Sequence, residues 1–144
     1  MKKEYIEQLV REGMLRIRQP DNERIKSLIK SAEIDADAAK QIALSDATAN
    51  IIFKSLYDAI RQLADAQWWL QGYEPEDHKT ALESLNELSI KEKTKLNFLD
   101  RFRRIRNDAS YRGFRISVLQ AQEMIDFWKL CGKEIIEILR TQIK

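Results

Sequence analysis

The sequence predicts an all-α fold, an up-and-down bundle of four to five main helices with one additional short helix. Apolar residues recur at helical spacing along almost the whole chain. The 144 residues include only four glycines and two prolines, which argues against a β-rich fold with many turns. This length suits one domain with one core, so we expect a single domain over residues 1–144.

The first 44 residues are predicted to form two helices. Apolar residues from Ile6 to Ile17 follow helical spacing, which indicates a helix over residues 2–18. Pro20 interrupts the pattern, and Asp21 is a good N-cap for a second helix that reaches Ala43. The far half of the second helix presents only alanines on its apolar stripe, so a neighbouring helix is expected to approach closely.

Residues 48–142 are predicted to form the core of the bundle. Gly72 and Gly113 stand where a left-handed residue commonly follows a helix, and Ser117 with Gln120 matches a capping box. The predicted elements are a helix over 48–71, a turn over 73–77, a short helix over 78–88, a helix from about 94 to 112, and a last helix whose apolar residues run from Ala121 to Leu139.

Composition excludes several classes of site. The chain has one His and one Cys, whereas a zinc site made from these residues needs about four ligands, and a disulfide framework needs paired cysteines. The isolated glycines do not form the usual dinucleotide or P-loop motifs. The N-terminus lacks an apolar signal core, and no apolar run approaches the roughly 18 residues of a membrane span. We expect a cytoplasmic protein without a metal, a cofactor or a membrane partner.

Positive charge is concentrated in residues 98–116. This segment contains six arginines and two aspartates, a net charge of +4, whereas the whole chain carries +2. Arginine binds phosphate through paired hydrogen bonds, so the segment is a candidate surface for nucleic acid or nucleotide. The alternative is a solvated helix face with Arg–Asp pairs. The candidate phosphate-binding residues are Arg103, Arg106, Ser110, Arg112 and Arg115.

Arg106 stands out on a helical wheel because it lies within the apolar arc, between Phe102 and Leu99. A guanidinium on a packing face is costly unless it is paired or faces a wet cleft. Either Arg106 forms a structural pair with a carboxylate such as Asp58 or Asp65, or it is a binding or catalytic arginine at a helix or subunit seam.

Two segments resemble HEPN domains (higher eukaryotes and prokaryotes nucleotide-binding). Residues 106–113, RNDASYRG, resemble the signature helix, and residues 55–61, SLYDAIR, with Gly72-Tyr73 and the later His78 resemble the matching central region. The resemblance covers roughly residues 48–142. It implies a helical bundle that forms a homodimer, with the signature helices facing each other across a basic cleft. Many members are metal-independent ribonucleases of toxin–antitoxin, defence or RNA-processing systems.

The resemblance also implies site residues. The family motif is Arg, a polar residue, a short spacer and His, which places Arg106, Asn107 and Tyr111 at the catalytic positions. Tyr111 replaces the motif histidine. Imidazole titrates near pH 6.5 and phenol near pH 10, so this replacement implies a degenerate or weak ribonuclease.

Three hypotheses about function follow. The first is a homodimeric RNA- or nucleotide-binding protein whose last two long helices form the interface, because their apolar faces exceed what one bundle needs. The second is a non-catalytic interaction subunit, such as the helper of a separately encoded small nucleotidyltransferase. The third is a structural bundle with Arg106 in a buried ion pair. His78 is expected to cap or pack a helix, and Cys131 to be a small buried residue.

Overall fold

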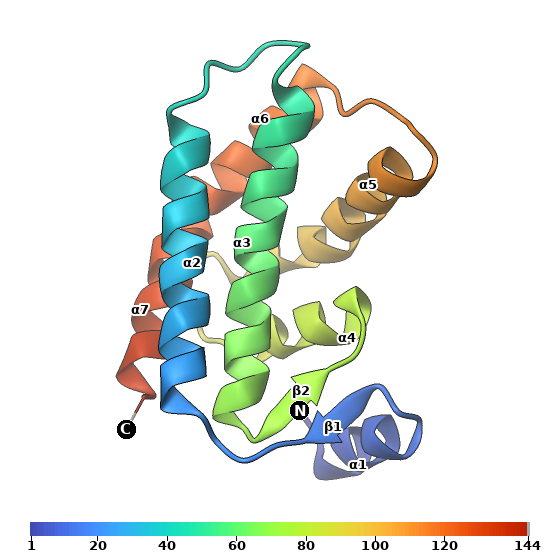
Figure 1. Ribbon diagram of the computed structural model, residues 1–144, viewed down its shortest axis with the longest axis vertical. Helices are drawn as coiled ribbons and strands as arrows, with labels where there is room; N and C mark the ends of the chain where they lie inside the picture. Colours follow the sequence, from blue (N-terminus) through green and yellow to red (C-terminus); the bar gives the residue numbers. More distant parts are fainter. Residues whose placement is uncertain (144) are drawn as a thin grey trace.

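The computed structural model describes residues 1–143 and confirms the all-α bundle (Figure 1). The elements are α1 (Lys3–Arg11), β1 (Leu15–Ile17), α2 (Asn22–Lys40), α3 (Ala49–Leu70), β2 (Tyr73–Pro75), α4 (His78–Glu83), the 3₁₀ helices η1 (Ser84–Glu87) and η2 (Lys93–Phe98), α5 (Leu99–Tyr111), α6 (Val118–Phe127), the π-helical turn η3 (Trp128–Gly132) and α7 (Lys133–Thr141). Over the residues described, no helix has both the length and the apolar character needed to cross a membrane.

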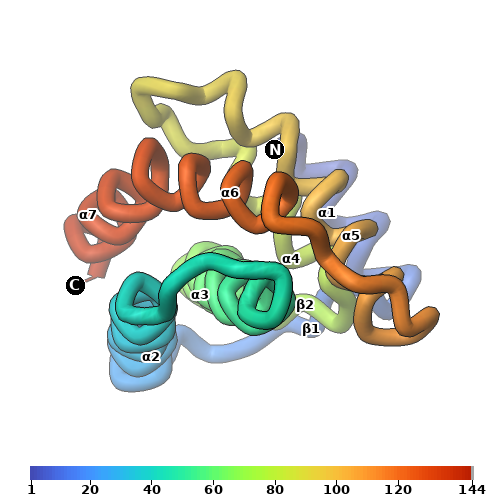
Figure 2. The backbone as a smooth tube through the Cα atoms, turned by 90° about the horizontal axis from the view of Figure 1, so that it is seen from above, coloured from blue at the N-terminus to red at the C-terminus, as the bar shows by residue number. Residues whose placement is uncertain are grey.

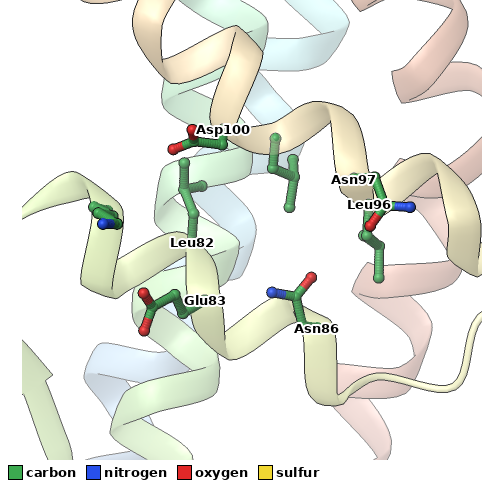
Figure 3. Close-up of a pocket in the computed structure, with 8 residues that line it drawn as sticks. Leu82, Glu83, Asn86, Leu96, Asn97 and Asp100 are labelled. Carbon is green, nitrogen blue, oxygen red and sulfur yellow. The ribbon is translucent and has the colours of Figure 1, made fainter.

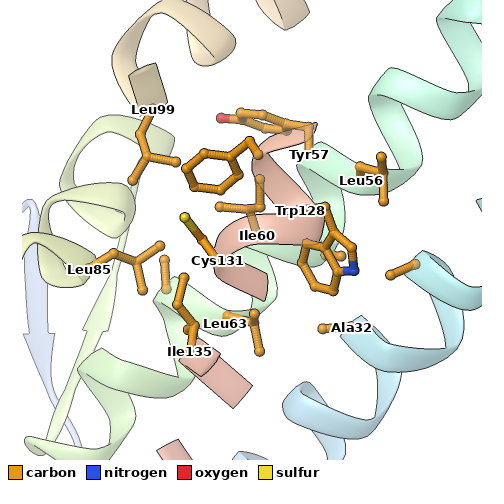
Figure 4. Packing of buried hydrophobic residues seen from close by; sticks show 14 of the residues in the cluster. Ala32, Leu56, Tyr57, Ile60, Leu63, Leu85, Leu99, Trp128, Cys131 and Ile135 are labelled. Carbon is orange, nitrogen blue, oxygen red and sulfur yellow. The ribbon is translucent and has the colours of Figure 1, made fainter. Parts of the chain in front are cut away.

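Helix α3 is the centre of the molecule. It runs antiparallel to α2 and contacts α4, α5, α6 and α7 as well (Figures 1 and 2). Because it is surrounded, α3 buries apolar residues on several faces, including Phe53, Ile60 and Leu63. Trp128 and Cys131 of the C-terminal helices pack in the same core (Figure 4). The buried position of Cys131 was expected.

The alanine stripe is buried within α2, but the helix ends at Lys40, so the predicted extension to Ala43 is wrong and Ala43 is exposed. Ala32, Ala36 and Ala39 all belong to the main core. Small side chains let two helix backbones approach closely, and α2 packs mainly on α3. Asp21 is the N-cap, where its carboxylate accepts a hydrogen bond from the Arg24 backbone amide at 3.0 Å.

The predicted helix over residues 2–18 is wrong in its second half. Helix α1 ends at Arg11, because Gly13 has a φ of +77°, a conformation that no α-helix continues through. The chain then forms β1, which pairs antiparallel with β2. Ile17 is therefore exposed instead of lying on a helical stripe.

Three other predicted elements change in detail. The predicted turn over 73–77 contains β2, and the predicted helices over 78–88 and 94–112 include the 3₁₀ segments η1 and η2. The last helix begins with the predicted Ser117–Gln120 capping box but contains a π-helical turn at η3. A Cβ atom on Gly132 would lie 2.6 Å from two carbons of the Trp128 ring. Glycine at this position therefore makes room for the buried indole.

Candidate functional site

The arginines of residues 98–116 fall into two groups. Arg103 and Arg104 pair with Asp100 at 2.8 and 2.7 Å. Arg101 pairs with Glu123, and Arg112 lies 3.9 Å from Asp108. These four arginines therefore fit the alternative considered from the sequence, a solvated helix face whose arginines are paired with carboxylates. Within residues 1–143, Arg106 and Arg115 form no ion pair.

Arg106 does not form the buried ion pair considered from the sequence. Asp65 instead accepts from Arg61 at 3.1 Å, and Asp58 makes no ion pair with Arg106. The Arg106 guanidinium carbon lies 5.8 Å from the centre of the Tyr57 ring. Its Nε atom is buried and has no hydrogen-bond partner among the described residues. An unsatisfied buried donor costs free energy, and an incoming acceptor would reach this guanidinium through its Nη groups, which also make no hydrogen bond in the described chain.

Tyr57 also contacts the only histidine of the chain. The Tyr57 hydroxyl lies 2.9 Å from His78 Nδ1, and the two rings are nearly parallel with centres 5.7 Å apart. The expected capping role of His78 is wrong, because Asp77 caps α4 and its carboxylate accepts from the Thr80 amide. The expected packing role is correct, and the structure adds the hydrogen bond.

The pKa values of Tyr57 and His78 indicate which of the two side chains is protonated or neutral at pH 7. Burial raises the pKa of Tyr57 to about 12, against the opposing effect of Arg61 and Arg106. The phenol is therefore protonated at neutral pH, and we assign it as the donor to His78 Nδ1. Burial, followed by Arg61 and Arg106, lowers the pKa of His78 to about 4. A neutral imidazole that accepts at Nδ1 carries its proton on Nε2.

These residues form what we call the arginine–histidine cluster: Tyr57, Arg61, His78, Arg103 and Arg106. Helix α3 supplies Tyr57 and Arg61, the start of α4 supplies His78, and α5 supplies the other two arginines. All three arginines act electrostatically on His78. Guanidinium groups and an imidazole Nε2–H only donate hydrogen bonds. With this assignment, the cluster presents mainly donors and positive charge, which suits an anion.

The other predicted site residues lie outside this cluster. Tyr111 is 78% exposed, and its side chain makes no hydrogen bond or ring contact within the residues described. Ser110 and Arg115 are exposed, and Asn107 is half-buried. Arg112 stacks on the exposed Phe114, with its guanidinium carbon 4.7 Å from the ring centre.

Sequence reasoning therefore identified Arg103 and Arg106 but missed the contribution of α3 and α4. The fold brings His78 to Arg106, whereas no contact joins Tyr111 to the cluster. The signal that was available is the SLYDAIR segment, which contains both Tyr57 and Arg61. Nothing in the spacing of that segment indicated that His78 would accept a hydrogen bond from it.

The apolar surface expected to form a dimer is largely buried within the chain. Leu99 and Phe102 of α5 belong to the core, as do Ile135 and Leu139 of α7. The large apolar side chains that remain exposed on these helices and their connections are Phe98, Tyr111, Phe114, Leu119 and Leu130.

Comparisons of the chain with protein-family models, with curated proteins and with solved structures give no match. Over the described part of the chain, no group of three or more His, Cys, Asp or Glu residues is placed to hold a metal ion.

Proposed function

We propose that this chain is an RNA- or nucleotide-binding protein of the HEPN type, which holds a phosphate group at the arginine–histidine cluster. The RNDASYRG segment on α5 and the SLYDAIR segment on α3 support the family, and both contribute residues to the cluster. Arg112 and Arg115, further along the chain, extend the positive surface toward neighbouring phosphates.

The carrying observation is the buried Arg106 Nε, which lacks a partner although its helix is rich in aspartate-paired arginines. A phosphate oxygen is a strong acceptor, and hydrogen bonds to charged groups contribute about 1.5–3 kcal/mol each. His78 supplies an additional neutral donor on Nε2.

The same protonation pattern favours binding over cleavage. Metal-independent RNA cleavage requires a group that accepts a proton near neutral pH. The Nδ1 lone pair of His78 accepts from Tyr57, its Nε2 is protonated, and its pKa is about 4. We therefore propose a degenerate or weak ribonuclease of the toxin–antitoxin or defence type, which binds RNA with little turnover.

Fluorescence anisotropy with a labelled single-stranded RNA tests this proposal. A dimer that neutralises about four to six phosphates gives a slope of roughly −3 to −4 in a plot of log affinity against log salt concentration. Arg106→Ala should weaken binding by about tenfold or more at low salt. Arg11→Ala is the matched control, since Arg11 is an exposed arginine on α1 with no ion pair in the described structure. Equal affinity of wild type and Arg106→Ala, or no binding at low salt, rejects the proposal.

A second candidate is the non-catalytic interaction subunit. The exposed side chains of Tyr111, Phe114 and Leu119 favour it, because large apolar groups close together in the chain are common at protein interfaces. This candidate predicts that the chain forms a complex with a small nucleotidyltransferase and that added salt does not dissociate the complex. It also predicts no measurable RNA binding.

A further inference from the structure

A pocket of about 250 Å³ opens between two neighbouring parts of the fold, and it contains none of the predicted site residues. Helix α4 and η1 form one wall, while η2 and the start of α5 form the other. Figure 3 shows Glu83 and Asn86 facing Asn97 and Asp100 across the opening. This volume is below the usual range for a complete drug-sized ligand and suits a single ring system.

The lining combines an apolar base with free polar groups. Leu82, Leu96 and Leu99 are almost completely buried and supply the apolar part. The side chains of Asn86 and Asn97 are exposed and make no hydrogen bond inside the described chain. Glu83 accepts from the Tyr5 hydroxyl through Oε2, which leaves Oε1 for another donor. A flat ring with N–H groups on its edge matches such a lining.

The pocket lies next to the arginine–histidine cluster. Asp100 lines the pocket and also pairs with Arg103 of the cluster, while Lys79 of the pocket follows His78 directly. Along the axis of α5, Arg106 lies about 9 Å from Asp100, and the two side chains leave the helix about 120° apart. That separation is comparable with the reach from the phosphate of one nucleotide to its own base.

We infer that this pocket binds the nucleobase of the ligand whose phosphate is held by the arginine–histidine cluster. The inference rests on the proposed phosphate binding. Guanine fits the lining best, because it presents N1–H and an amino group side by side, and Glu83 Oε1 can accept from one of them while an amide oxygen of Asn86 or Asn97 accepts from the other. The amides of Asn86 and Asn97 donate and accept, so they complement the carbonyl and the ring nitrogens of the same base.

Isothermal titration calorimetry with two ligands separates the contribution of the base to binding affinity from that of the phosphate. Guanosine 5′-monophosphate carries both groups, whereas ribose 5-phosphate lacks the base. The wild-type protein should bind the nucleotide about tenfold more tightly than the sugar phosphate, equivalent to about 1.4 kcal/mol. Asn97→Ala and Glu83→Gln should each reduce this ratio toward one and leave the affinity for ribose 5-phosphate unchanged. Gln41→Ala, at an exposed position after α2, is the control.

The outcomes distinguish this inference from the function on which it rests. Equal wild-type affinity for the two ligands overturns the base pocket, and the phosphate site then stands if Arg106→Ala weakens both ligands alike. Failure of ribose 5-phosphate to bind at all rejects the phosphate site. Nucleotide binding that is insensitive to Asn97→Ala and Glu83→Gln also overturns the pocket. Both substitutions change side chains at the protein surface, and circular dichroism verifies that the variants are folded.

Discussion

At the residue scale, the Tyr57–His78 hydrogen bond determines what the candidate site can do. A histidine in water is partly protonated near pH 6.5 and exchanges its proton between both ring nitrogens. Here burial and the arginines favour the neutral ring, and the Tyr57 hydroxyl occupies Nδ1. The remaining Nε2–H is a fixed donor. Contact with Tyr57, together with burial and the nearby arginines, thus favours a neutral donor at a residue that commonly acts as an acid or base.

Nuclear magnetic resonance of the imidazole tests this assignment. The chain has a single histidine, so its ring signals need no separate assignment. We expect nitrogen shifts of the Nε2–H tautomer at pH 7 and a pKa of about 4 for His78. Tyr57→Phe removes the donor to Nδ1, so we expect a mixture of tautomers in that variant. A pKa of 6 or more in the wild-type protein contradicts the assignment.

The same pKa makes folding stability depend on pH. The folded pKa of His78, about 4, is below the ordinary value of 6.5, so the unfolded chain binds this proton more readily. The contribution of His78 to the free energy of unfolding is complete above pH 6.5 and is lost as the pH falls toward 4. One proton limits the slope to about 1.4 kcal/mol per pH unit. His78→Asn should flatten the urea-unfolding profile over this window, whereas identical profiles would show that His78 titrates alike in both states.

At the element scale, the sequence predicts what is decided locally. The N-cap Asp21, the capping box at Ser117 and the alanine stripe of α2 are local signals, and all three are confirmed. The pairing of β1 with β2 was missed because it joins segments more than fifty residues apart. Gly13 was the available signal for the end of α1, but the apolar spacing of residues 2–18 continued through it.

The π-helical turn η3 leads to a prediction about Gly132. In Gly132→Ala, the new methyl group would lie 2.6 Å from the indole carbons of the buried Trp128. Overpacking of this kind costs about 1–3 kcal/mol, which exceeds the gain of up to about 1 kcal/mol in helix propensity. We expect a lower free energy of unfolding in urea.

Lys133→Ala is the control for this prediction, because Lys133 is the exposed neighbour of Gly132 in the same helical segment. Its free energy of unfolding should stay within about 0.5 kcal/mol of the wild-type value. If Gly132→Ala is as stable as the wild type, the Trp128 ring has room to move and glycine is not needed there.

At the scale of the whole molecule, the candidate site is harder to predict from local sequence patterns than the fold class is, because its residues come from several helices. The helical wheel identified Arg106 because one helix is enough to place it on a packing face. The cluster, however, requires α3, α4 and α5 to meet, and single-helix patterns contain no information about that contact. The pocket beside it is formed by four short segments, whose contact no spacing in the chain indicates.

Dimer formation is the remaining prediction at this scale, and it now depends on different residues. The apolar stripes of the last helices are used in the core, so the exposed side chains must supply the interface. The Ile116 amide donates to Asn50 Oδ1 at 2.7 Å, which fixes the connection after α5 against the start of α3. Phe114 and Leu119 flank this anchored point, and Leu119 is 72% exposed. A two-fold contact here would cover apolar groups that otherwise face water.

Multi-angle light scattering measures the outcome directly. We expect wild-type protein at tens of micromolar to have twice the chain mass of 17.0 kDa. Leu119→Glu should reduce the mass to that of one chain, because a two-fold interface would bring two buried carboxylates together. Ile34→Glu is the matched control, since Ile34 is an exposed isoleucine on α2, and it should remain dimeric. A monomeric wild-type protein would reject the dimer prediction. If both variants were monomeric, the added charge alone, and not the loss of this surface, would explain the effect.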